Sequence, residues 1–397
     1  MKRLALILAA AFALAGCETM GAAPPGAGWI GAWGASPSPP PANAKSFEYQ
    51  TVRQVVRLSA AGAKVRIRFT NEYGDQPLVI GGASVAKAAS PTGGPSGSVI
   101  PLTFNGAKEV TIPPKSPMFS DPVDLNVAAL DSISISVFLP KATGPCTCHP
   151  QGTATAWVSA PGDFTAAGSF EPTSTFLNRA YISEVEVMPA SPRLVVVTFG
   201  DSITDGTRST NDANARWPDV LAQRLNAANG PAVVNAAISG NRVLSYGNAI
   251  FGEAALSRLD RDVFSVPGVR WMTVLEGIND LGMGRGPGQP TPEMLINGYK
   301  QIIARAHAHG IKVYGVTLMP YNGAAYYDEP GEATREKVND WIRTGGGFDG
   351  VIDFDKLMQD PANPKKLKAD LQSGDWLHPN DAGYKVMGEA VDLALFK

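Results

Sequence analysis

The chain has 397 residues, more than one ordinary domain holds, so its length predicts two domains. Its 34 Lys and Arg residues against 36 Asp and Glu residues exclude the basic excess of a nucleic-acid-binding protein. An apolar fraction of 44% with only 18% charged residues, together with 42 Gly and 32 Pro, favours a globular protein rich in strands and turns over one built from long charged helices.

Residues 1–16 have the features of an export signal. Lys2 and Arg3 precede an apolar run over 4–15, which is shorter than the roughly 20 residues of a membrane-spanning helix. The run ends in Leu-Ala-Gly before Cys17. This resembles the signal of bacterial lipoproteins and implies cleavage before Cys17 and lipidation of that cysteine. Cleavage would remove two positive charges and change the net charge from −2 to −4. A secretory signal with an incidental Cys17 is the alternative.

We expect residues 17–46 to comprise the lipidated Cys17, a tether and a Pro-rich segment that leads into the folded part. The tether, residues 18–28, has eleven residues. Fully extended at about 3.3 Å per residue, it reaches about 36 Å, so the folded part would work close to a membrane. Glu18 after the cysteine, rather than Asp, resembles lipoproteins sent to the outer membrane. The expected location is that of an exported bacterial lipoprotein anchored in the outer membrane, on its periplasmic or cell-surface face.

Residues 47–190 have a period-two pattern. In KVRIRFT, the apolar Val65, Ile67 and Phe69 alternate with polar residues, which buries one face of a strand and exposes the other. Turn signals separate further strand-like runs at 51–58, 78–85, 110–112, 131–139, 153–158 and 179–187. Many short strands with few helical stretches predict an antiparallel β-sandwich or jelly-roll-like domain.

Two further cysteines lie in the sequence Cys146-Thr147-Cys148-His149. No fourth cysteine or suitably spaced histidine completes a structural zinc site, so we predict no metal site. A disulfide between positions i and i+2 is geometrically tight but possible in an exported protein. The favoured interpretation is two thiols or a local disulfide in a loop.

The pattern changes after residues 188–194, and the domain boundary is expected near 189–193. Continuous apolar runs at 194–199, 232–238, 269–275, 311–319 and 351–354 alternate with helical patterns at 217–228, 292–309, 332–343 and 380–396. Strands without polar alternation, separated by helices, indicate a parallel sheet covered on both faces. Residues 193–397 are therefore predicted to form a three-layer α/β/α domain.

The stretch VVVTFGDSITDG, residues 195–206, places a serine just beyond a buried strand. Ligands of such sheets bind beyond the carboxyl ends of the strands, and Ser202 lies three residues past Phe199. A serine nucleophile needs a base. Of the four histidines, His378 follows Asp375 by three residues and directly precedes the final helix. An Asp at this spacing can bind the imidazole and fix its tautomer, so Ser202, His378 and Asp375 are the candidate triad.

Two other strand ends carry groups that could stabilise an oxyanion. Gly240 follows the run at 232–238 and can present a backbone N–H without a side chain in the way. Asn279 follows the run at 269–275 and can direct an amide N–H to the same point. Acyl transfer needs such donors. Taken singly, each is an ordinary turn residue. Their positions at the ends of successive strands favour the functional interpretation.

Four blocks of residues resemble those of the SGNH, or GDSL, hydrolase superfamily. They are Gly200-Asp201-Ser202-Ile203-Thr204, Gly240, Gly277-Ile278-Asn279-Asp280 and Asp375-Trp376-Leu377-His378-Pro379, in the family's order within 193–397. The resemblance implies that Ser202 is the nucleophile, His378 the base and Asp375 its orienting acid. It also implies an oxyanion hole formed by the N–H groups of Ser202 and Gly240 and the Asn279 amide. Such a hydrolase needs no cofactor or metal.

The front half adds a second resemblance. WIGAWGASP at 29–37 and the strand-rich segment 51–86 are similar to the β-rich leader of secreted SGNH esterases of the XynE-like group, and RLDRDVFSVPGVRWMTVLEGINDLG at 258–282 fits the same group. This implies removal of O-acetyl or other short acyl groups from carbohydrate or aryl esters. The expected partner is then an acylated polysaccharide or oligosaccharide.

Aromatic residues near the site are candidates for substrate contact. Tyr321, Tyr326 and Tyr327 lie in the loop after the run at 311–319, and Trp376 lies two residues before His378. Aromatic rings at these places could stack on a sugar or aryl group, with ordinary packing as the alternative.

Three other functions compete with a carbohydrate or aryl esterase. The first is a lipolytic or general short-chain esterase, or a thioesterase, at the membrane face. The second is a non-catalytic glycan-binding surface lipoprotein. The third is phosphoryl transfer, which Asp201 and Asp205 superficially suggest. These two acids are separated by three residues rather than one, and no set of Mg²⁺ ligands accompanies them.

Overall fold

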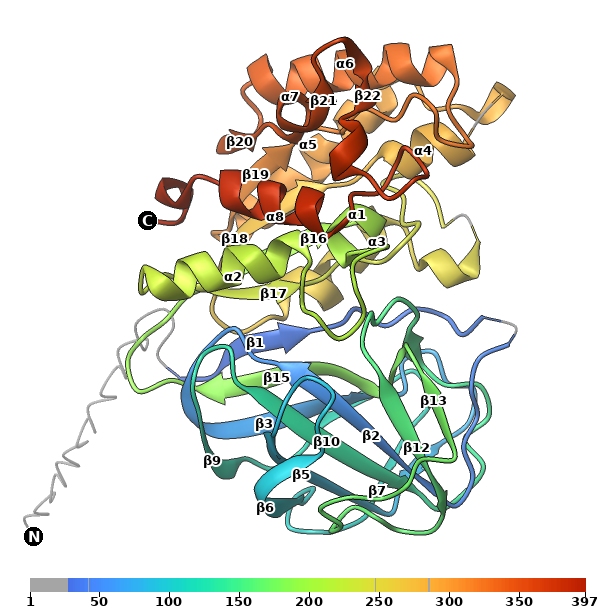
Figure 1. The fold of residues 1–397 in the computed structure, drawn as a ribbon, viewed down its shortest axis with the longest axis vertical. Coiled ribbons are helices and arrows are strands. Elements are labelled where there is room, and N and C mark those ends of the chain that lie inside the picture. The colour runs from blue at the N-terminus through green and yellow to red at the C-terminus, as the bar shows by residue number, and fades with distance from the viewer. Residues whose placement is uncertain (1–27, 42, 247, 285) are drawn as a thin grey trace, which may run out of the picture.

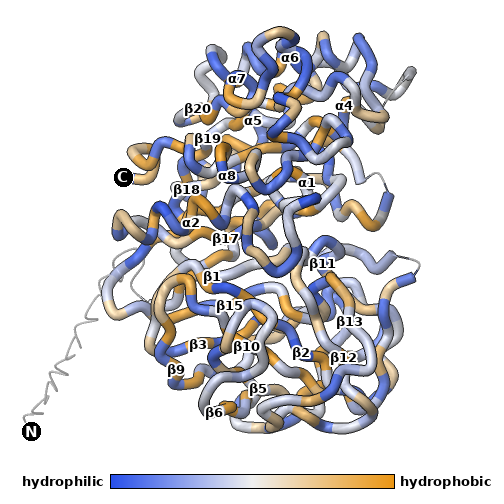
Figure 2. Tube along the Cα trace, viewed as in Figure 1, coloured by the Kyte–Doolittle hydropathy of each residue, from blue (hydrophilic) through white to orange (hydrophobic). Residues whose placement is uncertain are grey.

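The computed structural model describes residues 28–41, 43–246, 248–284 and 286–397, so the predicted signal and Cys17 lie outside the described residues. Figure 1 shows a β-rich region formed by the first half of the chain beside an α/β region formed by the second. No helix within the described ranges is long and apolar enough to cross a membrane. Hydrophobic stretches occur in both regions (Figure 2).

Two antiparallel sheets make up most of the β-rich region. One has six strands in the order β13 (Ser174–Phe176), β12 (Ala156–Pro161), β2 (Gln50–Arg57), β10 (Ser132–Leu139), β5 (Gly82–Ala88) and β6 (Pro95–Leu102). The other has β1 (Ile30–Gly34), β15 (Ile182–Met188), β3 (Gly62–Thr70) and β8 (Pro117–Phe119) in order, with β9 (Val123–Val127) also on β3. Short pairs join β4 (Leu78–Ile80) to β7 (Val110–Ile112) and β11 (Cys148–His149) to β14 (Arg179–Ala180). The sandwich or jelly-roll arrangement stays a prediction.

Strand β3 confirms the alternation expected from the sequence, because Val65, Ile67 and Phe69 are all fully buried. The single strand expected at 78–85 is instead two strands, β4 and β5, which break at Gly81 and join different sheets.

Strand β1 lies in the Pro-rich segment, where no strand was expected. It pairs antiparallel with β15, and Ile30 faces Val187. Its first four residues are buried, so the strand shows no polar alternation from which it could be predicted.

The α/β region is built on a five-stranded parallel sheet, as predicted. The strand order is β17 (Ala232–Asn235), β16 (Val195–Gly200), β18 (Val269–Leu275), β19 (Lys312–Val316) and β20 (Gly350–Ile352). Its longer helices are α2 (Trp217–Ala227), α5 (Pro292–Ala308), α6 (Glu329–Thr344) and α8 (Asp381–Ala390). The shorter ones are α1 (Ser202–Asp205), α3 (Ala255–Leu259), α4 (Ile278–Met283) and α7 (Phe354–Met358). Because β16 lies between β17 and β18, the ends of these three strands meet at the point where the strand order reverses.

The predicted helices agree with the structure except near their ends. Helix α6 begins three residues earlier than expected, because the Asp328 side chain accepts the Gly331 N–H and caps it there. The helical pattern at 380–396 forms α8 and, after a break, a 3₁₀ turn at Leu393–Phe396.

The two regions contact each other along β1 and β17 (Figure 1). The Gly31 N–H donates to the Pro267 carbonyl at 3.0 Å, and the Val233 N–H donates to Ser59 Oγ at 3.1 Å. A Cβ on Gly34 would lie 2.6 Å from a methyl group of Val234, so only glycine permits this approach. The regions are therefore closely packed.

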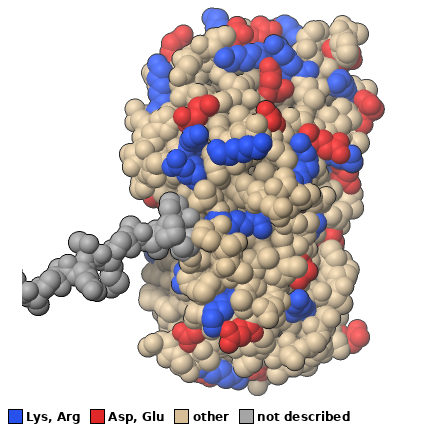
Figure 3. All heavy atoms as spheres, turned by 90° about the vertical axis from the view of Figure 1, so that its left-hand side faces the viewer, with Lys and Arg blue, Asp and Glu red and all other residues tan. Residues whose placement is uncertain are grey.

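Charges on the face shown in Figure 3 are of both signs, with Lys and Arg interspersed with Asp and Glu over both regions. This distribution agrees with the balanced charge of the sequence. No large patch of one sign is present on that face.

Candidate active site

Ser202 begins helix α1 directly beyond strand β16. A Cβ on Gly200 would lie 2.3 Å from Thr204 Oγ1 and 2.8 Å from the Leu275 carbonyl oxygen, so glycine is required where the strand turns into the helix. Asp201 is the N-cap of α1, and its Oδ1 accepts the Ile203 N–H at 3.0 Å. Asp201 therefore holds the turn by binding nearby backbone.

The structure brings the three candidate triad residues together. His378 Nε2 lies 2.8 Å from Ser202 Oγ, and His378 Nδ1 lies 2.8 Å from Asp375 Oδ2. The two contacts form a continuous path from the hydroxyl through the imidazole to the carboxylate. Such a path can take a proton from the hydroxyl and stabilise the resulting imidazolium.

Asp375 is held in its ionised form by the turn that it closes. Its Oδ1 accepts the N–H groups of Leu377 and His378 at 3.0 and 2.9 Å. Partial burial raises the pKa of Asp375, but the hydrogen bonds from His378 and Leu377 outweigh burial and hold the pKa well below its usual range. Arg208, largely exposed, adds a cation 3.6 Å from Asp375 Oδ2.

The candidate oxyanion donors lie at the ends of three adjacent strands. Among the described residues, neither the Ser202 N–H nor the Gly240 N–H donates to a protein acceptor. Gly240 has φ +79°, and a Cβ there would lie 2.2 Å from the Phe251 ring. Asn279 Nδ2 donates to the Asn241 carbonyl at 3.1 Å, and its Oδ1 accepts the Tyr326 hydroxyl at 3.2 Å. These two bonds fix the amide and leave its second N–H for another acceptor.

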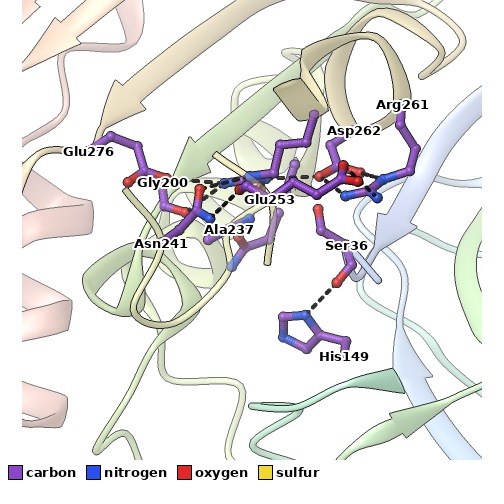
Figure 4. A network of polar contacts seen from close by, with 12 residues as sticks. Ser36, His149, Gly200, Ala237, Asn241, Glu253, Arg261, Asp262 and Glu276 are labelled. Atoms are coloured by element: carbon purple, nitrogen blue, oxygen red, sulfur yellow. Dashed lines mark hydrogen bonds and ion pairs between the residues drawn. The ribbon is translucent and has the colours of Figure 1, made fainter. Parts of the chain in front are cut away.

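A fully buried arginine, which sequence reasoning missed, lies beneath these strand ends. Arg258 donates to the carbonyl of Gly200 at 3.1 Å, the carbonyl of Ala236 at 2.6 Å and Glu276 Oε1 at 3.1 Å. It also donates to Asn241 Oδ1 at 2.9 Å and Asp262 Oδ2 at 2.9 Å. Figure 4 shows Gly200, Asn241, Asp262 and Glu276 in this network of polar contacts. The guanidinium thus joins the ends of β16, β17 and β18.

Buried carboxyl groups surround this arginine. Burial raises the pKa of Asp201 to about 7 and the pKa of Asp280 to about 6. It also raises the pKa of Glu276 well above its usual value, and the neighbouring Asp201 adds to that shift. Asp280 accepts the N–H groups of Val243 and Leu244 at 2.8 and 3.0 Å, which holds the segment after Gly240 in place.

The four aromatic candidates for substrate contact have different surroundings. Tyr321 is fully buried and packs against Tyr327, with ring centroids 5.1 Å apart, so its assignment to substrate binding is wrong. The partly buried Tyr326 contacts Asn279 directly. Tyr327 is partly exposed and binds Glu329 at 2.8 Å. Trp376 is partly buried, with the Lys366 ammonium 4.7 Å from its ring centroid. Substrate contact stays a prediction for Tyr326, Tyr327 and Trp376.

Cys146 and Cys148 form a disulfide with each other, which confirms the local bridge. His149, the next residue, is buried against the α/β region, with Nε2 2.9 Å from Asp205 Oδ1 and Nδ1 2.9 Å from the Ser36 carbonyl oxygen. Figure 4 shows its ring turned toward Ser36. No sequence signal pointed to this contact, because 56 residues separate the two partners.

Comparison with known proteins identifies the α/β region. Residues 198–386 match the family model of the GDSL-like Lipase/Acylhydrolase family. The C-terminal half of the chain is a GDSL-like hydrolase domain. The matched span of this GDSL-like domain contains Ser202, Gly240, Asn279, Asp375 and His378. None of the curated proteins matches the chain significantly.

Solved structures similar to the GDSL-like domain cover about half of the chain. A G-D-S-L family protein from Desulfitobacterium hafniense DCB-2, described as lipolytic, has 25% identity and a TM-score of 0.39 over 50% of this chain and 97% of that one. The M. smegmatis aryl esterase has 17% identity and a TM-score of 0.40 over 50% and 95%. Est24, a carbohydrate acetylesterase from Sinorhizobium meliloti, has 16% identity and a TM-score of 0.38 over 50% and 96%.

Proposed function

We propose that this hydrolase is a serine carboxylic-ester hydrolase that acts through an acyl-serine intermediate. The observation that carries the proposal is the hydrogen-bonded path from Ser202 Oγ through both nitrogens of His378 to Asp375, with 2.8 Å at each step. The path lies at the carboxyl ends of the parallel strands, where such sheets bind ligands.

In the proposed mechanism, His378 takes the Ser202 proton as Oγ attacks the ester carbonyl carbon. The oxyanion accepts hydrogen bonds from the N–H groups of Ser202 and Gly240 and from the free amide N–H of Asn279. The C–O bond of the ester then breaks, and the alcohol leaves with the proton from His378. Water, deprotonated by His378, hydrolyses the acyl-serine and restores the hydroxyl. Asp375 stabilises the imidazolium in both halves of the reaction.

The substrates we propose are carbohydrate or aryl esters of acetyl and other short acyl groups. The resemblance of the front half and of 258–282 to XynE-like esterases supports a carbohydrate or aryl group as the alcohol part of the ester. The placement of Tyr326 supports a short acyl group, because its ring packs on Gly282 and its hydroxyl binds Asn279, so it occupies space beside the proposed oxyanion hole.

The first test is hydrolysis of p-nitrophenyl acetate by the wild type and by Ser202→Ala. We expect the variant to lose at least about 10³-fold in kcat with an unchanged thermal midpoint, because the nucleophile is removed. Near-normal turnover in the folded variant would exclude Ser202 from the role. Activity that persists in EDTA but is lost to a fluorophosphonate would separate serine chemistry from phosphoryl transfer.

A substrate panel distinguishes the esterase alternatives. It comprises acetylated xylan, acetylated pectin, feruloyl esters, an acyl-CoA, and p-nitrophenyl esters of increasing chain length. The proposal predicts that kcat/KM falls as the acyl chain grows beyond a few carbons. A rise with chain length would favour a lipolytic enzyme, and a preference for acyl-CoA would favour a thioesterase. Binding to glycans without any turnover would favour a surface adhesin.

We also propose that the mature protein is a lipoprotein with two domains, residues 47–190 and 193–397. The segment 17–46 precedes them, and its strand β1 pairs with β15 of the first domain. Lipidation would keep the enzyme at the outer membrane. The test is metabolic labelling with an alkyne fatty acid in a Gram-negative host. Label in the wild type and none in Cys17→Ala is expected, and label in neither would contradict lipidation.

A further inference from the structure

His149 of the β-rich region contacts the helix that carries the proposed nucleophile. Its Nε2 lies 2.9 Å from Asp205 Oδ1, and Asp205 is the last residue of α1, which begins with Ser202. Both side chains are almost completely buried, with 5% and 2% exposure. A buried contact between the two regions can fix the position of helix α1 relative to the segment that carries His149.

Both ring nitrogens of His149 take part in hydrogen bonds. The Ser36 carbonyl oxygen can only accept, so Nδ1 carries a proton. Asp205 Oδ2 accepts the N–H and the Oγ–H of Ser239 at 3.0 and 2.7 Å, so Oδ1 is the oxygen that pairs with Nε2. The contact therefore holds one proton between the two side chains.

The charges around the pair favour the protonated form of His149. Burial and the nearby Arg216 lower the pKa of His149, but the Asp205 carboxylate and the two hydrogen bonds outweigh them and raise it. Arg179 and Arg216 line the same small cavity. Arg216 is itself bound by Asp219 at 2.7 Å, so its charge is largely neutralised there.

Asp205 links the histidine to two parts of the proposed active site. Through its backbone it belongs to the helix of Ser202. Through Oδ2 it holds Ser239, the residue before Gly240, whose N–H is a proposed oxyanion donor. A shift of Asp205 would move the nucleophile and this donor relative to each other, and a misplacement of about 1 Å can cost about 100-fold in rate.

Contacts within the β-rich region fix the backbone around His149. Strand β11 pairs with β14, and the Cys146–Cys148 disulfide closes the turn immediately before the histidine. The Ser38 N–H donates to the Cys148 carbonyl at 3.0 Å, which fixes the segment that supplies Ser36.

We propose that His149 is a positioning residue of the hydrolase, through which the β-rich region sets Ser202 and the Gly240 turn in their catalytic arrangement. This inference rests on the proposed function. It assigns to the β-rich region a part in catalysis that is separate from any binding of substrate.

The test compares four full-length variants with the wild type. His149→Leu and Asp205→Asn break the pair, and His149→Gln keeps one donor for Asp205. Tyr73→Phe is the matched control, because it removes another hydrogen bond between the regions, from Arg261 to the Tyr73 hydroxyl at 2.5 Å, far along the chain from α1. Each is measured for kcat and KM on p-nitrophenyl acetate, for thermal midpoint, and for hydrogen–deuterium exchange in peptides covering 200–206 and 236–243.

We expect His149→Leu and Asp205→Asn to lower kcat by about 10- to 100-fold with little change in KM, and to raise exchange in both peptides. His149→Gln should recover part of kcat, and Tyr73→Phe should change neither kcat nor exchange in these peptides. If His149→Leu matched Tyr73→Phe in kcat and in exchange, the inference would be overturned.

The exchange measurement separates this inference from the proposed function. A wild type without turnover on any ester would refute the proposed ester hydrolase function. Hydrogen–deuterium exchange at 200–206 and 236–243 would still decide whether His149 orders these two segments. If His149→Leu does not fold, the comparison between His149→Gln and Tyr73→Phe decides the inference. Equal kcat and equal exchange in those two variants would then overturn it.

Discussion

Asp375 and His378 show which side-chain contacts a sequence can predict. They are three residues apart, so a single turn brings carboxylate and imidazole together, and the 2.8 Å contact follows from local geometry. The 2.8 Å contact between His378 and Ser202 spans 176 residues. It was expected from the position of Ser202 beyond a strand and of His378 before the final helix, and from the resemblance of both blocks to SGNH hydrolases. Tyr321 was misassigned, because position in an edge loop does not tell whether a ring points outward or into the core.

Asp375→Asn tests the orienting role of this carboxylate. The amide cannot hold the imidazole in the same tautomer, so we expect kcat to fall by about 10⁴-fold while the protein stays folded. The measurement is p-nitrophenyl acetate hydrolysis, with the exposed Asp370→Asn as control, which should retain full activity. A loss below tenfold would mean that Asp375 does not orient the base.

Asp201→Asn tests the cost of a buried charge next to the nucleophile. Burial raises the folded-state pKa of Asp201 to about 7, above the unfolded value of about 4. Its contribution to stability is complete below pH 4 and is lost as the pH rises through 7. An Asn can still accept the Ile203 N–H without charge. We therefore compare the difference in thermal midpoint, variant minus wild type, at two pH values. We expect this difference to be at least about 2 °C larger at pH 8 than at pH 5.

The measurement for Asp201→Asn is calorimetry of both proteins at the two pH values. Asp370→Asn, an exposed site, is the control and should show no pH-dependent difference. A constant offset between variant and wild type at pH 5 and pH 8 would show that Asp201 is not protonated in the folded state.

At the scale of elements, the ends of β16, β17 and β18 carry most of the candidate site, and Arg258 holds them together. Periodicity predicted these strands well: the expected and observed bounds of β18 are identical at Val269–Leu275. Periodicity did not predict β1, because side chains on both faces of this strand are buried. It did not predict the break at Gly81 either, because that break depends on what packs against the strand. Arg258 could not be found either, since a charged residue in a helical pattern is ordinarily exposed.

Arg258→Lys should destabilise the fold strongly. A lysine keeps the charge but cannot supply the five donors that reach Gly200, Ala236, Asn241, Asp262 and Glu276, and buried carboxylates lose their partner. We expect the free energy of unfolding to fall by about 3–5 kcal/mol, measured by urea denaturation. Arg305→Lys, whose Asp260 partner is exposed, should cost less than about 1 kcal/mol. Equal costs would refute the bridging role.

In the molecule as a whole, the β-rich region and the GDSL-like domain pack against each other along β1 and β17. The sequence predicted a β-rich part followed by an α/β part, because the hydrophobic period changes from two to that of helices and continuous strands; the exact domain boundary stays a prediction. It could not predict how they meet. The contact uses single residues from distant segments, such as His149 with Asp205 and Thr155 with Asp212 Oδ1 at 2.6 Å.

The packing predicts that both regions unfold together. Hydrogen bonds join them at β1, at Ser59 and at His149, so loss of either region would expose buried polar groups on the other. We expect one calorimetric transition whose van't Hoff and calorimetric enthalpies agree within about 10–20%. Two separate transitions, or a ratio near two, would show that the regions fold independently.

The proposed mechanism depends above all on Ser202 as the nucleophile. This role can be tested by mass spectrometry of the full-length protein after reaction with a fluorophosphonate. We expect one phosphonyl group, mapped to Ser202, whose appearance follows the loss of esterase activity and which is absent from Ser202→Ala. Inactivation with the label on a different residue, or no labelling of an active wild type, would contradict it.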